Sequence, residues 1–365
     1  MKFGWEIKTL DQIAVNLDSK RIPITKADRI SGEYPYYGAS GIVDYVADFI
    51  FDEETLLVSE DGANLLARST PIAFPATGQY WVNNHAHILK FENKITQRLV
   101  ELYLESIPLE DYITGAAQPK LNQKALNSIP IPVPPLPEQH RIVAILDAAF
   151  DHIATARANC EANLLNARAI FESHLQAVFT QRGDGWVTHT LDELSTNCDN
   201  QRIPITKSDR KSGEFRYYGA SGVVDYVDEY IFDGDYLLVS EDGANLLARS
   251  TPIAFSVSGK FWVNNHAHIL QFKAIATQKF VEFYLESIKL DEYITGAAQP
   301  KLNQKLLYSI PIPIPTEVAK QAKIVESIQL FSTETQRLES LYQRKLQALD
   351  DLKKSLLHQA FSGAL

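Results

Sequence analysis

A long internal repeat is the feature that most constrains this chain. The segment LLVSEDGANLLARSTPIAF occurs twice without a change, at 56–74 and again at 237–255. The same offset relates RIPITK, YYGASG, WVNNHAHIL and YITGAAQPKLNQK to second copies of themselves. Solenoid and propeller repeats have periods of about 20 to 50 residues, so a repeat as long as half the chain must be a whole domain with its connector. The sequence therefore predicts that one half of the chain is a duplicate of the other.

Each half contains two kinds of sequence. Its first part, which is 1–135 in the first half, is rich in Gly, Pro, Tyr and β-branched residues, and short apolar runs such as TLLVS, TPIAF and HILKF lie between turn signals. A helix is expected at 95–107, where apolar residues follow helical spacing. The expected fold class is therefore α/β (α+β) with a substantial β content. Each globule ends in a proline run, IPIPVPPLPEQ after Ser128 and IPIPIPTEVAK after Ser309, which predicts an extended and stiff exit.

A long helix is expected after each globule. Residues 138–179 include no Pro or Gly, and apolar residues recur in steps of three and four from Ile142 to Val178 and, in the second half, from Ile324 to Ala360. A helix of about 40 residues is about 60 Å long. Its apolar stripe would face water unless the two helices pair. Antiparallel pairing would place the globules at opposite ends of the pair, related by a pseudo-twofold axis. The expected divisions are 1–135 for globule 1, 136–182 for long helix 1, 183–316 for globule 2 and 317–365 for long helix 2.

Composition limits the possible classes of protein. Only Cys160 and Cys198 are available, so a disulfide framework or a four-cysteine zinc site is excluded, and both are expected to be reduced thiols. No run of about 18 apolar residues and no signal-like start are found, so no membrane span is expected and the predicted location is the cytoplasm. The net charge of -10 argues against a protein that coats nucleic acid by bulk electrostatics.

Sequence motifs of catalysis are not found. The chain has no GxxxxGK phosphate loop followed by Ser or Thr, no GxGxxG after a strand, no GxSxG elbow and no HExxH helix. The best metal candidate is HAH, because His85 and His87 would project from the same face of a strand. However, Lys273 of the second copy replaces Glu92 of the first. We therefore expect no catalytic residues and no metal, with structural or nucleic-acid-facing histidines. A duplicated metal-binding β-domain enzyme centred on HAH stays open as the alternative.

The acidic pair Glu60 and Asp61 recurs as Glu241 and Asp242. Paired carboxylates can perform acid/base chemistry or hold Mg²⁺. The surrounding SEDGAN is also typical of a turn at the end of a strand, and we prefer this interpretation.

Two near-identical globules, each leaving through a proline run into a long helix, resemble the specificity (S) subunit of type I restriction-modification systems, HsdS. The resemblance covers essentially the whole chain. It is carried by the opening GWEIKTLDQI, the closing stretch QPKLNQKALNSIPIPVPPLPEQHRIVAILD and the helix running to FESHLQAVFTQ, with second-half counterparts QPKLNQKLLYSIPIPIP, KQAKIVESI and LLHQAFSG. It implies that each globule is a target recognition domain reading one half of a split site in double-stranded DNA, and that the helices form a coiled-coil spacer.

The same resemblance implies partners and cofactors. The helices would dock two methyltransferase (M) subunits, and restriction/translocase (R) subunits would join the assembly. S-adenosylmethionine, and ATP with Mg for restriction, would be bound by those partners, so the chain itself would be non-catalytic and would need no cofactor.

This sequence departs from the family pattern, in which the two recognition domains differ. Identical readers related by a twofold axis contact the two strands equivalently, so we expect an interrupted palindrome as the target. A helix of about 60 Å corresponds to about 17 base pairs, which is an upper bound on the spacing of the half-sites. Because TEVAK replaces PLPEQ in the second exit, the two partner-docking surfaces are not expected to be equal.

Candidate DNA-reading residues are drawn from the repeated loops, because Arg, Lys, Asn, Gln, Ser and Thr read base edges and aromatic side chains add stacking. In the first copy they are Arg21, Lys26, Tyr37, Ser40, Asn64, Arg68, Asn83, Asn84, His85, Lys120, Asn122 and Gln123. In the second copy they are Arg202, Lys207, Tyr218, Ser221, Asn245, Arg249, Asn264, Asn265, His266, Lys301, Asn303 and Gln304. Asn64 and Arg68 are favoured individually. For the QPKLN segment we prefer phosphate contact or fold maintenance to base readout, and Tyr36 and Trp81 are expected in the core.

A structural coiled-coil adaptor is a further interpretation, but it gives no reason for the loops to be as nearly invariant as the core.

The charges refine the preferred interpretation, in which each globule reads DNA. Residues 1–135 and 183–316 each contain 12 basic and 17 acidic residues, so neither globule is basic. Isolated DNA affinity is therefore expected to be weak and salt-sensitive, with most phosphate contacts supplied by the M subunits.

Overall fold

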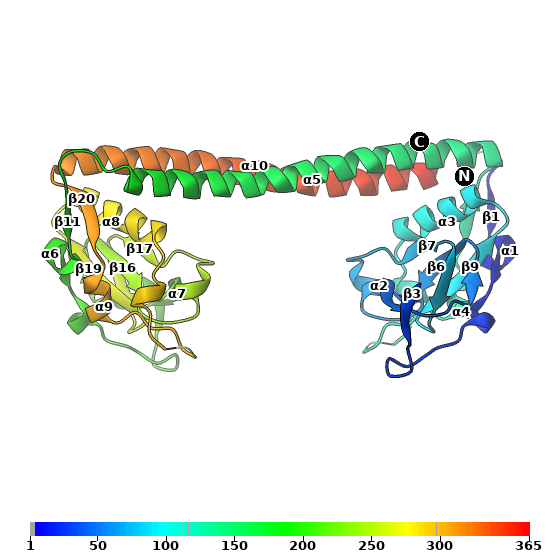
Figure 1. The fold of residues 1–365 in the computed structure, drawn as a ribbon, viewed down its shortest axis with the longest axis horizontal. Coiled ribbons are helices and arrows are strands. Elements are labelled where there is room, and N and C mark those ends of the chain that lie inside the picture. The colour runs from blue at the N-terminus through cyan, green and yellow to red at the C-terminus, as the bar shows by residue number, and fades with distance from the viewer. Residues whose placement is uncertain (1–3, 116, 297) are drawn as a thin grey trace. The chain divides into compact units, whose positions relative to one another are not determined.

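The computed structural model describes residues 4–115, 117–296 and 298–365 (Figure 1). The first three residues of the start considered for a signal peptide, and residues 116 and 297 of the two TGAAQPKLNQK segments, lie outside this described part. The chain divides into two compact units. Unit 1 consists of two segments, the part of the chain up to Cys160 and the C-terminal segment Arg344–Leu365, and unit 2 is Glu161–Gln343. Each unit thus contains one globule and parts of both long helices.

The globule of unit 1 alternates short strands with short helices. Its elements are β1 (Glu6–Lys8), α1 (Leu10–Ile13), β2 (Ala14–Asn16), a 3-10 turn (Asp18–Lys20), β3 (Ser31–Gly38), β4 (Gly41–Val46), β5 (Phe51–Asp52), β6 (Thr55–Ser59), α2 (Asn64–Ala67), β7 (Ala73–Ala76), β8 (Gln79–Val82), β9 (Ala86–Phe91), α3 (Lys94–Ser106), a 3-10 turn (Glu110–Tyr112), α4 (Gln123–Asn127) and β10 (Ile131–Val133). This confirms the mixed α/β class with short strands.

Two four-stranded sheets form the body of this globule. The first has the order β2-β9-β6-β7 and is antiparallel, and the second has the order β4-β3-β8-β5, in which β3 and β8 run parallel. Leu56 and Val58 of β6 belong to the same core as Val100 of α3, whereas Leu57 packs with Tyr80 of the second sheet. Because both faces of β6 are covered, TLLVS is a continuous apolar run instead of an alternating one.

The first and last strands close each globule. β1 pairs antiparallel with β10, so that Ile7 lies opposite Pro132. The extended exit predicted from the proline run is confirmed for its first part, which is a strand paired with the start of the repeat, whereas the end of the run already belongs to the long helix that begins at Leu136. Proline is compatible with an edge strand of this kind because one side of its backbone needs no partner.

The helix expected at 95–107 is α3, and its copy is α8 (Ile275–Ser287). Asn93 caps α3 by accepting a hydrogen bond from the Ile95 amide at 2.8 Å. Ala274 stands at the matching position of α8 and makes no such bond. The apolar spacing, not the cap, is therefore what the two helices share.

The globule of unit 2 repeats the order of elements and the order of strands in every sheet. Its other elements are β11 (Trp186–His189), α6 (Leu191–Leu194), β12 (Ser195–Asn197), a 3-10 turn (Asp199–Gln201), β13 (Ser212–Gly219), β14 (Gly222–Val227), β15 (Phe232–Asp233), β16 (Tyr236–Ser240), α7 (Asn245–Ala248), β17 (Ala254–Val257), β18 (Lys260–Val263), β19 (Ala267–Phe272), a 3-10 turn (Asp291–Tyr293), α9 (Gln304–Ser309) and β20 (Ile312–Pro315).

The long helices are α5 (Leu136–Thr180) and α10 (Val318–Ser362), each of 45 residues. In unit 1 the first half of α5 lies along the end of α10, and Arg157 pairs there with Asp350. In unit 2 the end of α5 lies along the start of α10, and the Arg168 Nε is 3.2 Å from the Glu339 Oε1. The two helices therefore run antiparallel, as predicted.

The helix stripes are mostly covered, with exceptions. Every stripe residue predicted on α5 is at least partly buried, whereas Leu338 and Leu352 of α10 are 44% and 46% exposed. Among the described residues no helix is long and apolar enough to span a membrane.

Each globule packs on the long helices of its own unit. In unit 1, Leu99 and Leu102 of α3 share a core with Leu146 of α5 and Leu357 of α10. In unit 2, Phe280 of α8 meets the Phe179 ring edge to face at 5.2 Å. Helices α3 and α8 thus hold the sheets to the long helices.

Candidate nucleic-acid interface

Five segments of each globule meet around the end of β6. In unit 1 they are 18–26, 38–41, 59–63, 83–87 and the described residues 114–115 and 117–122, which we call the loop cluster. The Glu60 amide donates to the His85 carbonyl at 2.9 Å, and the Leu121 amide donates to the Glu60 carbonyl at 2.8 Å. The Ser59 hydroxyl donates to the Ala39 carbonyl at the tip of the β3–β4 hairpin. Figure 1 shows the blue loop that includes residues 20–30 on the side of the globule away from the long helices.

A buried ion network holds the loop cluster together. The Arg21 Nη1 donates to the Glu60 Oε2 at 2.6 Å and to the Ala86 carbonyl at 2.9 Å. The Lys120 Nζ lies 3.1 Å from the other Glu60 oxygen. The network joins RIPITK, SEDGAN and QPKLN, so three of the repeated motifs are fixed against one another.

His87 and Asp18 extend this network. The His87 Nδ1 lies 2.6 Å from the Asp18 Oδ2, and its Nε2 lies 2.8 Å from the Leu121 carbonyl. Burial opposes the charged form of Asp18, but the hydrogen bond and charge of His87 outweigh burial and hold the pKa of Asp18 below its usual value. Burial likewise opposes the charge of Glu60, and hydrogen bonds from Arg21 and Lys120 hold its pKa below the usual range. Both carboxylates are therefore ionised at neutral pH.

Asp18, Glu60 and His87 bring one ligand atom each within 4.8 Å of one another, a grouping that could hold a metal ion. Its carboxylates are already paired with Arg21 and Lys120. The geometry considered for HAH, in which His85 and His87 project from the same face of a strand and share a cation, is wrong, because the two histidines do not face one site. His85 is 47% exposed and lies 2.9 Å from Asp61, whereas His87 is buried. The interpretation of SEDGAN as a plain turn was also incomplete, because Glu60 is the centre of the ion network.

Arg68 and Asn64 bond mainly within the globule. The Arg68 guanidinium donates to the carbonyls of Leu104 and Ile107, at 3.2 and 2.9 Å, where α3 ends. The Asn64 side chain accepts from the Thr70 amide at 3.0 Å. The backbone of Arg68 is left-handed, with φ of 50°, which is rare for a residue with a side chain. A DNA contact by these two residues remains a prediction.

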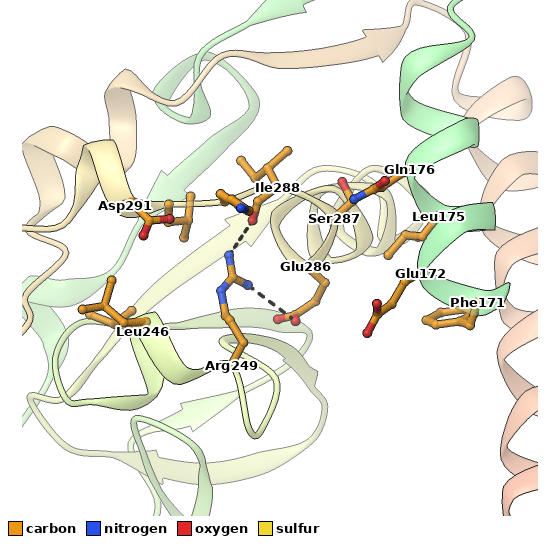
Figure 2. Close-up of a pocket in the computed structure, with 13 residues that line it drawn as sticks. Phe171, Glu172, Leu175, Gln176, Leu246, Arg249, Glu286, Ser287, Ile288 and Asp291 are labelled. Atoms are coloured by element: carbon orange, nitrogen blue, oxygen red, sulfur yellow. Dashed lines mark hydrogen bonds and ion pairs between the residues drawn. The ribbon is translucent and has the colours of Figure 1, made fainter. Parts of the chain in front are cut away.

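Figure 2 shows the same arrangement in unit 2, where Arg249 caps α8. Its Nη2 donates to the Ile288 carbonyl at 2.6 Å, and its Nη1 lies 3.7 Å from the Glu286 carboxylate. A cavity of about 520 Å³ lies beside it, lined by α7, the end of α8 and the last turns of α5 with Phe171 and Leu175.

Several other candidates in unit 1 also face inward. Tyr37 packs edge to face on Tyr80, and Asn83 is buried and accepts from the His85 amide at 2.8 Å. Asn122 caps α4 by accepting from the Ala125 amide at 3.0 Å. Tyr36 is buried, as expected; Trp81 is only half-buried, and its indole nitrogen donates to the Ile22 carbonyl at 2.6 Å.

The remaining candidates of unit 1 present polar groups to solvent. Within the described residues, four of them are exposed and make no side-chain hydrogen bond or ion pair: Lys26, Ser40, Asn84 and Gln123. His85 and Lys120 are about half exposed and keep donors free beyond their single acidic partners. These six residues are the ones that the structure leaves able to contact a ligand directly.

Unit 2 reproduces this arrangement. The Arg202–Glu241, Lys301–Glu241 and His268–Asp199 distances are 2.6, 3.1 and 2.6 Å. The exposed set is Lys207, Ser221, Asn265 and Gln304, with His266 and Lys301 half exposed, and the inward set is Tyr218, Asn245, Arg249, Asn264 and Asn303. One difference is that the Gln304 amide donates to the Tyr308 hydroxyl at 3.5 Å. The two loop clusters therefore offer the same groups in the same local geometry.

A group of exposed apolar side chains lies on β4, outside the polar residues expected from the sequence. Ile42, Val43 and Tyr45 are between 47% and 55% exposed. Their only signal in the sequence is that VDYV, at 43–46, is repeated unchanged at 224–227.

Comparison with known proteins shows the class to which this fold and site belong. The family described as type I restriction modification DNA specificity domain matches residues 3–162 and again 183–347. The chain belongs to this family, whose members are DNA-recognition subunits without catalytic activity of their own.

Individual relatives agree with this. A putative type I restriction enzyme specificity subunit of Haemophilus influenzae is 38% identical over 143 residues, which are 39% of this chain and 37% of that protein. The MjaVIII specificity subunit of Methanocaldococcus jannaschii is 22% identical over an alignment that covers 99% of this chain and 93% of that one.

Two solved structures are similar in fold. The HsdS subunit of Thermoanaerobacter tengcongensis aligns with a TM-score of 0.60 at 14% identity, covering all of this chain and 98% of that one. A chain from a structural study of type I restriction-modification complex assembly aligns with a TM-score of 0.76 at 15% identity, covering 100% and 99%. At this identity the likeness supports the fold alone.

Proposed function

We propose that this chain is the sequence-reading subunit of a type I restriction-modification complex, in which residues 1–135 and 183–316 each read one half of a bipartite DNA site. The observation that carries the proposal is the match between the two loop clusters. In both, the arginine lies 2.6 Å and the lysine 3.1 Å from the central glutamate, beneath the same exposed polar groups. Two identical surfaces of this kind fit two copies of one ligand.

The exposed groups suit DNA. Asn84 and Gln123 offer amide groups that hydrogen-bond to base edges, and Lys26 and Lys120 offer ammonium groups that pair with phosphates. The buried network fixes the backbone beneath them, which lowers the conformational cost of binding. We assign direct contact to the exposed six of each unit and indirect support to the inward-facing candidates.

The target should be an inverted repeat of one half-sequence. In each unit the helix that follows the globule packs its first turns on the last turns of the other helix, so exchanging α5 with α10 preserves this local arrangement, although the side chains that pair differ. Readers related by such an exchange contact opposite strands in the same way.

Neither globule is basic, so we infer that phosphate binding depends on partners. Two M subunits docked on the long helices would supply it, and R subunits would complete a restricting assembly. S-adenosylmethionine, and ATP with Mg, would be bound by those partners, while this chain would need no cofactor. Because it would bind the DNA of the cell, we infer that this chain is located in the cytoplasm.

The test uses the full chain with its methyltransferase partner and a library of random DNA duplexes. Repeated selection should enrich a bipartite motif, and the Asn84→Ala variant should relax one half while Asn84→Ala with Asn265→Ala relaxes both. Asn127→Ala, outside the loop cluster, should leave the motif unchanged. Failure to enrich any bipartite motif would refute the proposal.

A further inference from the structure

β4 and its copy β14 expose apolar side chains at the edge of a sheet. β4 is the outermost strand in the order β4-β3-β8-β5. Val43 and Tyr45 are 55% and 50% exposed, and their copies Val224 and Tyr226 are 56% and 50% exposed. Exposed apolar edge strands promote aggregation and are usually protected by charge or proline. Their presence in both units therefore needs a reason.

The apolar character is kept while neighbouring positions change. Ile30, Pro35 and Ala47 of the first copy become Lys211, Arg216 and Asp228 in the second. By contrast, VDYV is identical in both copies, and Ile42 changes only to Val223, another β-branched residue. The two hairpins thus differ in charge around a constant apolar surface, which indicates that the apolar groups themselves meet a common ligand.

The position of Val43 connects this surface to the loop cluster. A Cβ added to Gly38 would lie 2.9 Å from the Val43 Cγ1 and 3.4 Å from the Asn83 Nδ2. The Val43 side chain therefore lies over Gly38 close to Asn83, and the two residues that follow Asn83 are the exposed Asn84 and His85. In unit 2 the corresponding distances from Gly219 are again 2.9 and 3.4 Å. Only glycine leaves room for this contact, and both copies have it.

β4 and β3 form the edge hairpin of their four-stranded sheet, and the major groove of B-DNA admits a β-ribbon. In that groove the C5-methyl group of thymine is the apolar feature of the base edges. An exposed valine next to the Asn83 segment, which continues into the exposed Asn84 and His85, offers an apolar contact close to polar ones. A protein partner would also accept apolar groups, but polar donors next to them favour a base-pair edge, which presents both kinds of group together.

We propose that Val43 and Val224, with Ile42 and Val223 beside them, contact the methyl group of a thymine in the major groove of each half-site. This inference rests on the proposed function, because it specifies one contact within the half-site that each globule reads. It requires an A·T pair at the same place in both halves of the target.

Deoxyuridine tests the contact, because it differs from thymidine only by the missing methyl group. In the full chain with its methyltransferase partner, bound to the duplex obtained by selection, each thymine is replaced in turn. At one position in each half-site, loss of the methyl group should weaken binding about fourfold, the value of one buried methylene-sized group. The Val43→Ala with Val224→Ala variant should bind the thymine and uracil duplexes equally, and Val43→Ala alone should lose discrimination in one half only.

The matched control is Val15→Ala, which removes the same atoms from an exposed valine on β2 and should keep the discrimination. If the alanine variant fails to fold, Val43→Thr with Val224→Thr keeps the shape and should reduce the discrimination. A target without any methyl-sensitive thymine, or a double variant that still discriminates, would overturn the inference and leave the proposed function intact. Loss of methyltransferase binding with unchanged discrimination would also overturn it and would assign β4 to a protein contact. Selection of no bipartite site would overturn both proposals.

Discussion

The two globules agree closely at their loop clusters and differ where they meet the long helices. At the loop cluster the Arg21–Glu60 and Arg202–Glu241 distances are both 2.6 Å. At the helix side of unit 1, the Arg98 Nη2 lies 2.6 Å from Asp147 of α5. Lys279 replaces Arg98 in unit 2 and pairs with Glu282 of its own helix, at 2.9 Å.

The difference separates two kinds of constraint. The helix side of each globule has to match only the helix segments that it meets, so its side chains diverge together with those segments. The loop clusters pack on neither long helix in the described residues, and they differ only where Ser19 and Lys20 become Asn200 and Gln201. A shared external ligand explains this better than shared folding requirements, since the equally structural α3 and α8 have diverged.

The largest expected effect comes from removing the centre of the ion network. Glu60→Ala leaves Arg21 and Lys120 without their shared acid and should lower the free energy of unfolding by about 3 kcal/mol, as for other broken buried pairs. Glu241→Ala should cost a similar amount, because its contacts are the same. Urea unfolding measures both.

The control for this pair is Glu6→Ala, which removes an exposed acid paired with Lys8 and should cost less than about 0.5 kcal/mol. Costs that differ by more than about 1 kcal/mol between Glu60 and Glu241 would break the claimed equivalence of the loop clusters.

Arg68→Ala and Arg249→Ala come next. Each variant frees carbonyls at the end of α3 or α8 and should cost about 2 kcal/mol, because hydrogen bonds from a charged donor are lost. Thermal unfolding tests the cost, and DNA selection below the unfolding temperature should return the wild-type motif. An altered half-site with unchanged stability would instead support the prediction that Arg68 is a direct reader.

One pH effect should come from Glu101 of unit 1. Burial, only partly offset by Arg98, raises the pKa of Glu101 to about 7. The folded state therefore binds this proton more tightly than the unfolded chain, so stability should fall as pH rises from about 4.5 to about 7 and then level off. The loss should be on the order of 1 to 3 kcal/mol. Glu101→Gln should remove this slope in urea titrations between pH 4.5 and 8, and an unchanged slope would exclude Glu101 as its source.

The smallest expected effect concerns a cation present in only one copy. Lys20 is exposed next to Arg21, and the second copy has Gln201 there. Lys20→Gln should leave stability unchanged and should reduce the salt dependence of DNA binding by at most about one phosphate contact. A larger change would show that the two readers are less alike than their shared loops indicate.

The fold was largely predictable because its signals are local. The spacing of ITQRLVELYLESI is that of α3, the run TLLVS is β6, and the stripe that begins at Ile142 is the covered face of α5. The repeat then determined the organisation of the second half.

The site was less predictable because its contacts are distant in the sequence. Arg21 and Arg68 have the composition of DNA readers, but their partners lie 39 and 36 residues away, at Glu60 and Leu104. No local pattern reveals which arginine faces a buried acid or a helix end. Val43 was missed for a related reason: β4 is irregularly paired with β3, so alternation does not tell which of its side chains are exposed.

The central claim is that both globules read the same half-sequence, and sequencing of methylated adenines across the genome of the source cell tests it most directly. The account predicts a single motif in which one half-site is the reverse complement of the other, separated by an unspecified gap of fixed length. Two different half-sequences in that motif would contradict it.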